Sequence, residues 1–124
     1  NFMKKIKAID LYGGIGGWTL GLQMAGIEVV SSYEYWMPAI ESHNANFGHI
    51  SKPIDIRKLS ISDLPSDIDF IVGSPPCTQF SYSNRGGSGN INDGLVDIRK
   101  FLQIVTANLN IVLGRYPLEE SFCL

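Results

Sequence analysis

The 124-residue sequence is poor in the residues that build metal centres, disulfide frameworks and membrane spans. Its two cysteines, Cys77 and Cys123, are far apart and form no C-x-x-C pair, so the sequence predicts neither a bridged scaffold nor a zinc site. No apolar run approaches the length that crosses a bilayer. We therefore expect no metal and no membrane partner, and we interpret Cys77 as a free thiol.

Positive charge is scarce as well. Ten Lys and Arg residues stand against twelve Asp and Glu, which gives a formal net charge of -2 and no overall attraction to a polyanion. Residues 1–5 include two lysines but no apolar signal segment follows them, so we expect a cytoplasmic protein. The start at Asn1 suggests a fragment or the remnant of a leader, and the length fits one domain.

A glycine-rich turn stands between a strand and a helix near the start of the chain. The apolar run 7–12 predicts a strand, residues 13–17 are glycines apart from Ile15, and residues 18–26 predict a helix that Gly26 ends. Glycines allow the backbone to approach a ligand closely, and the following helix N-terminus suits an anionic group. The spacing is not that of a G-x-G-x-x-G dinucleotide site, and a tight packing turn is the alternative.

Residues 27–34 predict a second strand that ends at Glu34, about eighteen residues after the turn. In nucleotide-binding βαβ units a carboxylate at this place accepts hydrogen bonds from ribose hydroxyls, whereas the alternative is a solvated glutamate. Together with the glycine turn, Glu34 favours a cofactor that contains a nucleoside. Tyr35 and Trp36 follow, either as partners of a base or as core aromatics.

The segment after these aromatics predicts a helix over residues 38–46, and its inward face is formed by Ala39, Ile40 and His43. We interpret His43 as a core or surface histidine and not as a catalytic base. Residues 53–56 predict the end of a third strand. Asp55 there either meets an adenine amino group or caps a turn.

Cys77 follows the predicted end of another strand. The run 68–72 predicts a buried strand, which Gly73 and the prolines at 75 and 76 stop abruptly. Ligands of open parallel sheets bind at the carboxyl ends of the strands, so this thiol is placed for chemistry. It would react as the thiolate.

The rest of the chain predicts a loop, a helix and a strand. Residues 82–94 are rich in Gly, Asn and Ser, which predicts a long loop that covers the substrate, and a slack linker is the alternative. Residues 97–105 predict a helix, and residues 108–114 predict a strand. The apolar face of the expected helix consists of Ile98, Phe101, Leu102 and Val105.

Four of these segments resemble the DNA cytosine-5 methyltransferases. They are D-L-Y-G-G-I-G-G at 10–17, Y-E-Y at 33–35, D-I at 55–56 and G-S-P-P-C-T-Q-F-S at 73–81. The resemblance implies an α/β fold, namely an incomplete Rossmann-like S-adenosylmethionine-dependent methyltransferase fold with a parallel sheet flanked by helices. Residues 1–105 would form the N-terminal part of the catalytic domain, and residues 106–124 a divergent or truncated tail.

The resemblance also implies site roles. Cys77 would be the nucleophile that attacks C6 of a cytosine flipped out of double-stranded DNA, so that C5 accepts the methyl group. Ser81, Arg85 and Arg99 would meet DNA phosphate or the flipped nucleotide. S-adenosyl-L-methionine would be bound by Tyr12, Gly14, Ile15, Gly16, Gly17, Glu34, Tyr35, Asp55, Ile56 and Pro76.

The sequence departs from the family after residue 105. The Glu-Asn-Val motif, whose glutamate protonates the ring at N3, is not found, and we expect this chain alone to be a poor or inactive catalyst. The alternatives are a non-catalytic remnant that binds S-adenosylmethionine and one subunit of a split methyltransferase, with a second chain supplying the missing motifs. An amino-methylating enzyme and a redox thiol protein are weaker alternatives. The resemblance implies a bacterial or phage-encoded protein.

Overall fold

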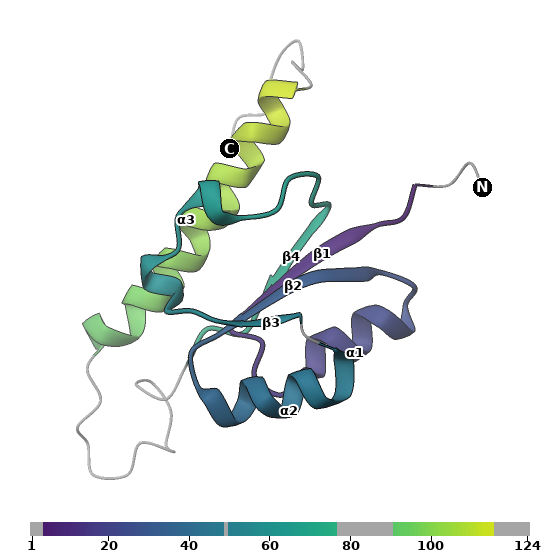
Figure 1. Cartoon of the computed structure of the whole chain (residues 1–124). Helices are drawn as coiled ribbons and strands as arrows, with labels where there is room; N and C mark the ends of the chain where they lie inside the picture. The colour runs from purple at the N-terminus through teal and green to yellow at the C-terminus, as the bar shows by residue number, and fades with distance from the viewer. Residues whose placement is uncertain (1–3, 49, 77–90, 116–124) are drawn as a thin grey trace.

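A computed structural model describes residues 4–48, 50–76 and 91–115 (Figure 1). The elements in chain order are β1 (Lys7–Leu11), α1 (Gly17–Met24), β2 (Glu28–Glu34), α2 (Met37–Phe47), β3 (Ser51–Pro53), the 3-10 helices η1 (Ile56–Lys58) and η2 (Ile61–Asp63), β4 (Phe70–Gly73) and α3 (Ile91–Arg115). The predicted order of strands and helices up to β4 is therefore confirmed, although β3 ends at Pro53 and Ile56 begins η1. The prediction of a buried strand over 68–72 is wrong in part, because β4 is only partly buried and Phe70 is 46% exposed. The described helices include none long and apolar enough for a membrane span.

The four strands form one parallel sheet in the order β3-β2-β1-β4. This arrangement confirms the predicted α/β class with a parallel sheet flanked by helices. In the register, Leu11 at the end of β1 lies opposite Tyr33 of β2 on one side and Gly73 of β4 on the other. The carboxyl ends of these three strands therefore meet at one edge, where the turns that follow them share one space.

The strands alternate between two apolar layers. The described core consists of two hydrophobic clusters. Ile9 and Leu11 of β1 are fully buried in the larger cluster, which also contains Ile104 of α3. Ala8 points to the other face and packs with Leu22 of α1. Figure 1 shows α1 and α2 together on one face of the sheet and α3 on the opposite face. This layering is the usual way in which a parallel sheet buries both faces.

Helix α1 ends as its sequence predicts. Gly26 has a φ of 79°, and its N–H donates to the Gln23 carbonyl while the Ile27 N–H donates to the Leu22 carbonyl. These two bonds form a Schellman cap, which favours glycine at the left-handed position. The expected role of Gly26 is confirmed.

Helix α2 also follows its prediction, because the three expected inward residues, Ala39, Ile40 and His43, are all buried. His43 Nε2 lies 2.8 Å from the Thr19 hydroxyl of α1, and its ring stacks edge-on against Phe47. Burial lowers the pKa of His43, so the ring is neutral at physiological pH. These contacts make it a core histidine.

Helix α3 requires two corrections to the predicted elements. It begins at Ile91, inside the stretch 82–94 that was predicted as loop, and it continues to Arg115, so the strand expected over 108–114 is wrong. A short run of Asn, Leu, Ile and Val fits a helix as well as a strand, and here the helix simply continues.

The predicted apolar face of α3 is also wrong in part. Leu102 is 56% exposed, whereas Ile104, which was not assigned to that face, is 1% exposed. The helix is rotated so that Asp97 and Ile104 face the sheet, with Phe101 packed against the larger cluster. Asp97, on this face, also forms an ion pair that is described below.

Candidate functional site

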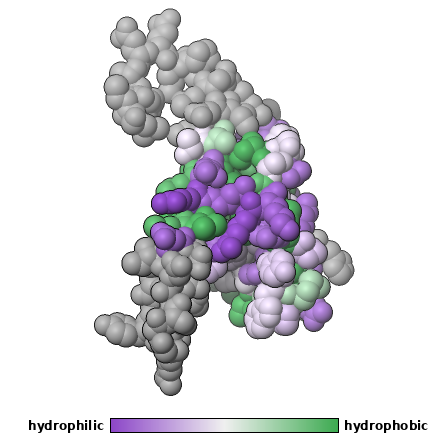
Figure 2. Space-filling model, turned by 90° about the vertical axis from the view of Figure 1, so that its left-hand side faces the viewer, coloured by the Kyte–Doolittle hydropathy of each residue, from purple (hydrophilic) through white to green (hydrophobic). Residues whose placement is uncertain are grey.

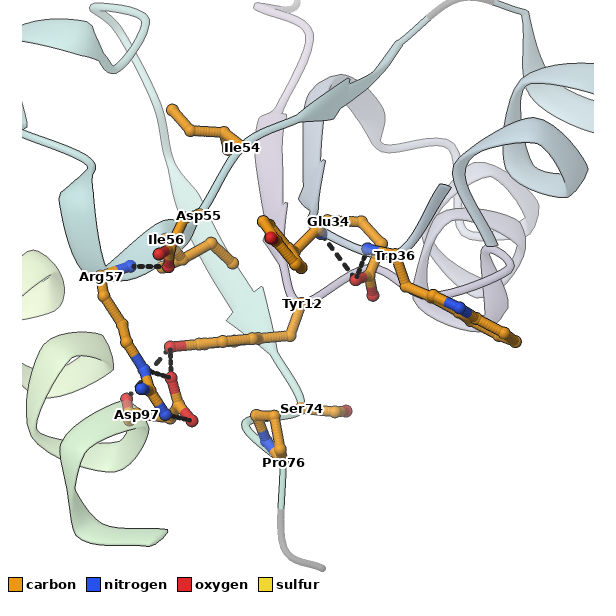
Figure 3. Close-up of a pocket in the computed structure, with 11 residues that line it drawn as sticks. Tyr12, Glu34, Trp36, Ile54, Asp55, Ile56, Arg57, Ser74, Pro76 and Asp97 are labelled. Carbon is orange, nitrogen blue, oxygen red and sulfur yellow. Dashed lines mark hydrogen bonds and ion pairs between the residues drawn. The ribbon is translucent and has the colours of Figure 1, made fainter. Parts of the chain in front are cut away.

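A cavity of about 500 Å³ opens at the edge where β1, β2, β3 and β4 end (Figure 3). It is lined by Tyr12, Glu34, Tyr35, Trp36, Ile54, Asp55, Ile56, Arg57, Ser74, Pro76 and Asp97. Its size lies within the usual range of small-molecule sites, about 300–1,000 Å³. Parallel sheets bind their ligands at this edge, so the cavity is the candidate cofactor site.

Six of the ten residues predicted to bind the cofactor line this cavity, namely Tyr12, Glu34, Tyr35, Asp55, Ile56 and Pro76. The other four, Gly14, Ile15, Gly16 and Gly17, form the turn beside it and are not among the lining residues. Gly16 has a φ of 109° and packs against Phe47 of α2. A side chain at Gly16 would overlap that ring, so this glycine has a packing role whatever the turn binds.

The turn itself is held tightly to β2. The Gly13 N–H donates to the Tyr33 carbonyl at 3.0 Å, and a Cβ on Gly13 would overlap the Ser32 hydroxyl. Tyr12 has a φ of 58°, in the left-handed region that non-glycine residues rarely adopt. The backbone therefore turns sharply after β1, which directs the Tyr12 side chain into the cavity (Figure 3).

Glu34 joins the glycine turn to the end of β2. Its Oε1 accepts a hydrogen bond from the Gly14 N–H at 3.1 Å, and its Oε2 accepts from the N–H groups of Tyr35 and Trp36 at 2.7 and 2.9 Å. A carboxylate has about four acceptor positions, so these bonds leave capacity for a ligand hydroxyl on Oε1. Glu34 therefore braces the backbone and also lines the cavity, which differs from the alternative of a solvated glutamate.

Asp55 follows β3 and caps η1. Its Oδ1 accepts a hydrogen bond from the Arg57 N–H at 3.1 Å, which is the turn-capping role foreseen for it. The side chain is half-buried and also lines the cavity, next to the buried Ile56. The capping bond fixes the carboxylate at the cavity wall, where its other oxygen can accept from a ligand amino group.

Tyr35 and Trp36 form the open side of the cavity. Tyr35 is 74% exposed and Trp36 is 65% exposed, so neither is a core aromatic. They also line a shallower hollow of about 480 Å³ over Met37 and Pro38. Exposed aromatic faces beside a cavity can stack against a flat ring.

Sequence reasoning missed an ion pair at the far end of the cavity. Arg57 and Asp97 form a bidentate pair, with Nε–Oδ1 and Nη2–Oδ2 distances of 3.1 and 3.0 Å, and the Tyr12 hydroxyl donates to Asp97 Oδ1 at 3.1 Å. The Arg57 guanidinium holds the pKa of Asp97 below its usual value, while burial and the nearby Asp97 raise the pKa of Tyr12. The only sequence signal was an acidic residue within an otherwise apolar helix face.

The end of β4 brings the expected nucleophile loop to the same edge. The Ser74 N–H donates to the Leu11 carbonyl at 3.3 Å, and Trp18 Nε1 of α1 donates to the Ser74 hydroxyl at 3.0 Å. Pro76 lines the cavity. Cys77 comes next, but Cys77, Ser81 and Arg85 lie outside the described residues, so their roles stay predictions.

Arg99 lies on α3, in a groove of about 270 Å³ next to the cavity. The groove is lined by Arg57, Val96, Arg99, Lys100 and Gln103. The side of the molecule that lies to the left in Figure 1 carries a band of hydrophilic residues across its middle (Figure 2). Arg57 is paired with Asp97, so Arg99 and Lys100 are the cations of this groove that suit a phosphate, which is compatible with the role predicted for Arg99.

Buried polar groups lie beneath the glycine turn. Asp10 is fully buried, and neither of its carboxylate oxygens has a hydrogen-bond partner within the described part of the chain; the same is true of the Ser32 hydroxyl. Burial, with a smaller contribution from the charge of Glu34, raises the pKa of Asp10 to about 7. Among the described residues no group of three His, Cys, Asp or Glu is arranged to hold a metal ion.

Comparison with known families confirms the resemblance. The family model described as C-5 cytosine-specific DNA methylase matches residues 6–107. The Type II methyltransferase M.HindV of Haemophilus influenzae is 34% identical over 107 residues, which are 84% of this chain and 34% of that protein. M.HgiGI of Herpetosiphon aurantiacus is 36% identical over 87 residues, which are 68% of this chain and 69% of that protein.

Solved structures of similar proteins agree with these matches. The S. pombe Dnmt2 methyltransferase superposes with a TM-score of 0.54 at 32% identity, covering 59% of this chain and 24% of that one. An E. coli prophage protein described as a DNA modification methyltransferase superposes with a TM-score of 0.65 at 29% identity, covering 82% of this chain and 29% of that one. The chain spans about a third of the length of M.HindV.

Proposed function

Because the chain belongs to the C-5 cytosine-specific DNA methylase family, we propose that it binds S-adenosyl-L-methionine in the cavity at the carboxyl edge of the sheet and presents Cys77 as nucleophile toward a cytosine in DNA. The observation that carries the proposal is the convergence of Glu34, Asp55 and Pro76 on one cavity, with Pro76 directly preceding the cysteine.

The lining residues have the chemistry that such a cofactor needs. Glu34 would accept from the ribose hydroxyls, Asp55 with the Ile56 backbone would meet the adenine edge, and Tyr35 would pack on its face. The main chain of the glycine turn would hold the methionine part. When bound, the cofactor supplies an electrophilic methyl group.

The reaction proposed for this chain uses the Cys77 thiolate. Its sulfur forms a bond to C6 of a flipped cytosine, which makes C5 nucleophilic enough to take up the methyl group. The C5 proton is then lost to a base, the C6–S bond breaks, and the thiolate leaves. Ser81, Arg85 and Arg99 are proposed to hold the DNA phosphates or the flipped nucleotide.

Protonation of the cytosine at N3 has no identified donor in this sequence. The Glu-Asn-Val motif of the family does not occur in these residues. Loss of such a proton donor typically costs about two to four orders of magnitude in rate. We therefore expect methyl transfer by this chain alone to be slow, and faster after addition of a chain that supplies the motif.

Two measurements test the proposal. Calorimetric titration with S-adenosylhomocysteine is expected to show binding to one site. Incubation with duplex DNA containing 5-fluorocytosine and S-adenosylmethionine is expected to give a covalent adduct that survives denaturing electrophoresis. Cys77→Ser should abolish the adduct, whereas Cys123→Ser, the same change at the other cysteine, should not.

A second candidate is a protein that binds S-adenosylmethionine without catalysis, or one subunit of a split methyltransferase. The observation that favours it is that the Glu-Asn-Val motif does not occur in these residues. Cofactor binding without any adduct would support this candidate. An adduct that persists in Cys77→Ser would contradict the proposed nucleophile.

A further inference from the structure

We propose that Arg57 and Asp97 are positioning residues, which hold the Tyr12 ring in place as a wall of the cofactor cavity. We call these three residues the Tyr12 clamp. The inference rests on the proposed function, because it assumes that the cavity binds S-adenosylmethionine. None of the four segments that carry the family resemblance contains Arg57 or Asp97.

The clamp joins three segments that are far apart in the sequence. Tyr12 belongs to the turn after β1, Arg57 to η1 and Asp97 to α3. The Tyr12 hydroxyl donates to Asp97 Oδ1 at 3.1 Å and lies 3.3 Å from the Asp97 backbone carbonyl. Figure 3 shows the Tyr12 ring extended across the cavity toward the ion pair, on the side opposite to Trp36.

The ion pair has the geometry of a strong contact. Both Asp97 oxygens accept from the Arg57 guanidinium, and Asp97 is 7% exposed, so water competes little for its carboxylate. Planar bidentate pairs of this kind fix orientation as well as distance. The Asp97 carboxylate is therefore a fixed acceptor for the Tyr12 hydroxyl.

The backbone of Tyr12 explains why its ring needs such an anchor. Its φ of 58° lies in the left-handed region, which is unfavourable for a residue that carries a Cβ atom. A strained turn persists only where its surroundings hold it. The hydroxyl bond to Asp97 restrains the ring at one end, and the Gly13 N–H bond to Tyr33 restrains the backbone at the other.

The clamp also connects the proposed adenine end of the cavity with the glycine turn beside the cavity. Arg57 directly follows Asp55 and Ile56, the residues proposed to meet the adenine edge, and its N–H caps the Asp55 carboxylate. Tyr12 directly precedes the glycine turn, which is proposed to hold the methionine part. Because the clamp residues are adjacent in sequence to both of these segments, we expect the clamp to act on cofactor affinity.

The test uses two variants and their combination in the full chain. Tyr12→Phe removes only the hydroxyl, and Asp97→Asn keeps the side-chain shape while it removes the charge. Each is expected to raise the dissociation constant for S-adenosylhomocysteine by about three- to tenfold, the effect of one partly buried hydrogen bond. In the double variant, Asp97→Asn should add little to Tyr12→Phe, because Asp97 acts through that ring.

Tyr33→Phe is the matched control. It removes a phenolic hydroxyl that is buried without a hydrogen-bond partner among the described residues, and Tyr33 does not line the cavity. Its dissociation constant should equal that of the unchanged chain. Thermal unfolding of every variant separates loss of affinity from loss of the fold.

The outcomes distinguish the two proposals. Normal binding by the unchanged chain together with an unaltered dissociation constant for Tyr12→Phe would overturn the clamp and leave the proposed function standing. Additive effects of the two substitutions would show that Asp97 does not act through Tyr12. No binding by the folded, unchanged chain would overturn the proposed function, and the clamp with it.

Discussion

Replacement of Asp10 by asparagine is expected to change how the stability of the fold depends on pH. Asp10 is the acidic residue that begins the glycine-turn motif, and it is fully buried on the face of the sheet that packs against α1. Its carboxylate oxygens find no hydrogen-bond partner in the described residues. Asp10→Asn keeps the size of the side chain and removes its ability to ionise.

The magnitude follows from the raised pKa. Burial raises the pKa of Asp10 in the folded chain to about 7, whereas the ordinary pKa of an aspartate is 3.8. Between these two values the folded state binds more protons than the unfolded state, so the free energy of unfolding falls as pH rises. The loss amounts to about 2–4 kcal/mol between pH 4 and pH 8, and it levels off above pH 7.

The assay is urea unfolding of both chains at several values between pH 4 and pH 8. Asp10→Asn should lack this decline, so its stability relative to the unchanged chain should rise with pH up to about 7. The amide also lacks partners, but that cost does not depend on pH. Comparison of the two chains at each pH cancels the contribution of His43, whose lowered pKa acts in the opposite direction.

Asp69→Asn provides a control with the opposite sign. The Asp69 carboxylate accepts from the Lys7 N–H at 3.0 Å, and this bond lowers its pKa. Its contribution to stability is therefore present near neutral pH and is lost as pH falls. A difference between the unchanged chain and Asp10→Asn that stays constant from pH 4 to pH 8 would refute the reasoning about Asp10.

Three further substitutions test the packing around the site, each by urea unfolding. Gly73→Ala should destabilise the chain by about 1–3 kcal/mol, because the new Cβ would lie 2.6 Å from both the Leu11 carbonyl oxygen and Phe101 Cε2. Equal stability of the variant and the unchanged chain would refute this steric argument. Gly21→Ala, in the open middle of α1, should instead stabilise it by about 0.5–1 kcal/mol, and a loss would contradict the open space there. Thr19→Val should cost about 1–3 kcal/mol, since it removes the partner of buried His43 Nε2; no change would mean that this bond contributes nothing.

The first three strands and their helices were predictable because their signals are local. The glycine turn, the proline at the start of α2 and the apolar runs each determine a few residues of backbone by steric means. Glu34 was recognisable for the same reason, since its distance from the turn is fixed by one βαβ unit. The cavity at the strand ends follows directly from that order of elements.

The rotation of α3 was not predictable from its apolar residues. Leu102 and Ile104 are equally apolar, and the structure buries Ile104 on the same face as Asp97, which pairs with Arg57, forty residues earlier in the chain. No local pattern relates those two positions. The same distance explains why Arg57 and Asp97 escaped notice as cavity residues, although each lies close to a predicted site residue.

The position of β1 in the sheet has a consequence for biosynthesis. Its neighbours are β2 and β4, and its Ala8 pairs with both Val29 and Phe70. Since parallel strands cannot pair through a hairpin, a ribosome that has released only the first half of the chain exposes one side of β1 without its partner. Of the four strands of this sheet, β1 leaves the ribosome first but is among the last to gain both of its partners, so its open edge needs protection from aggregation until β4 follows.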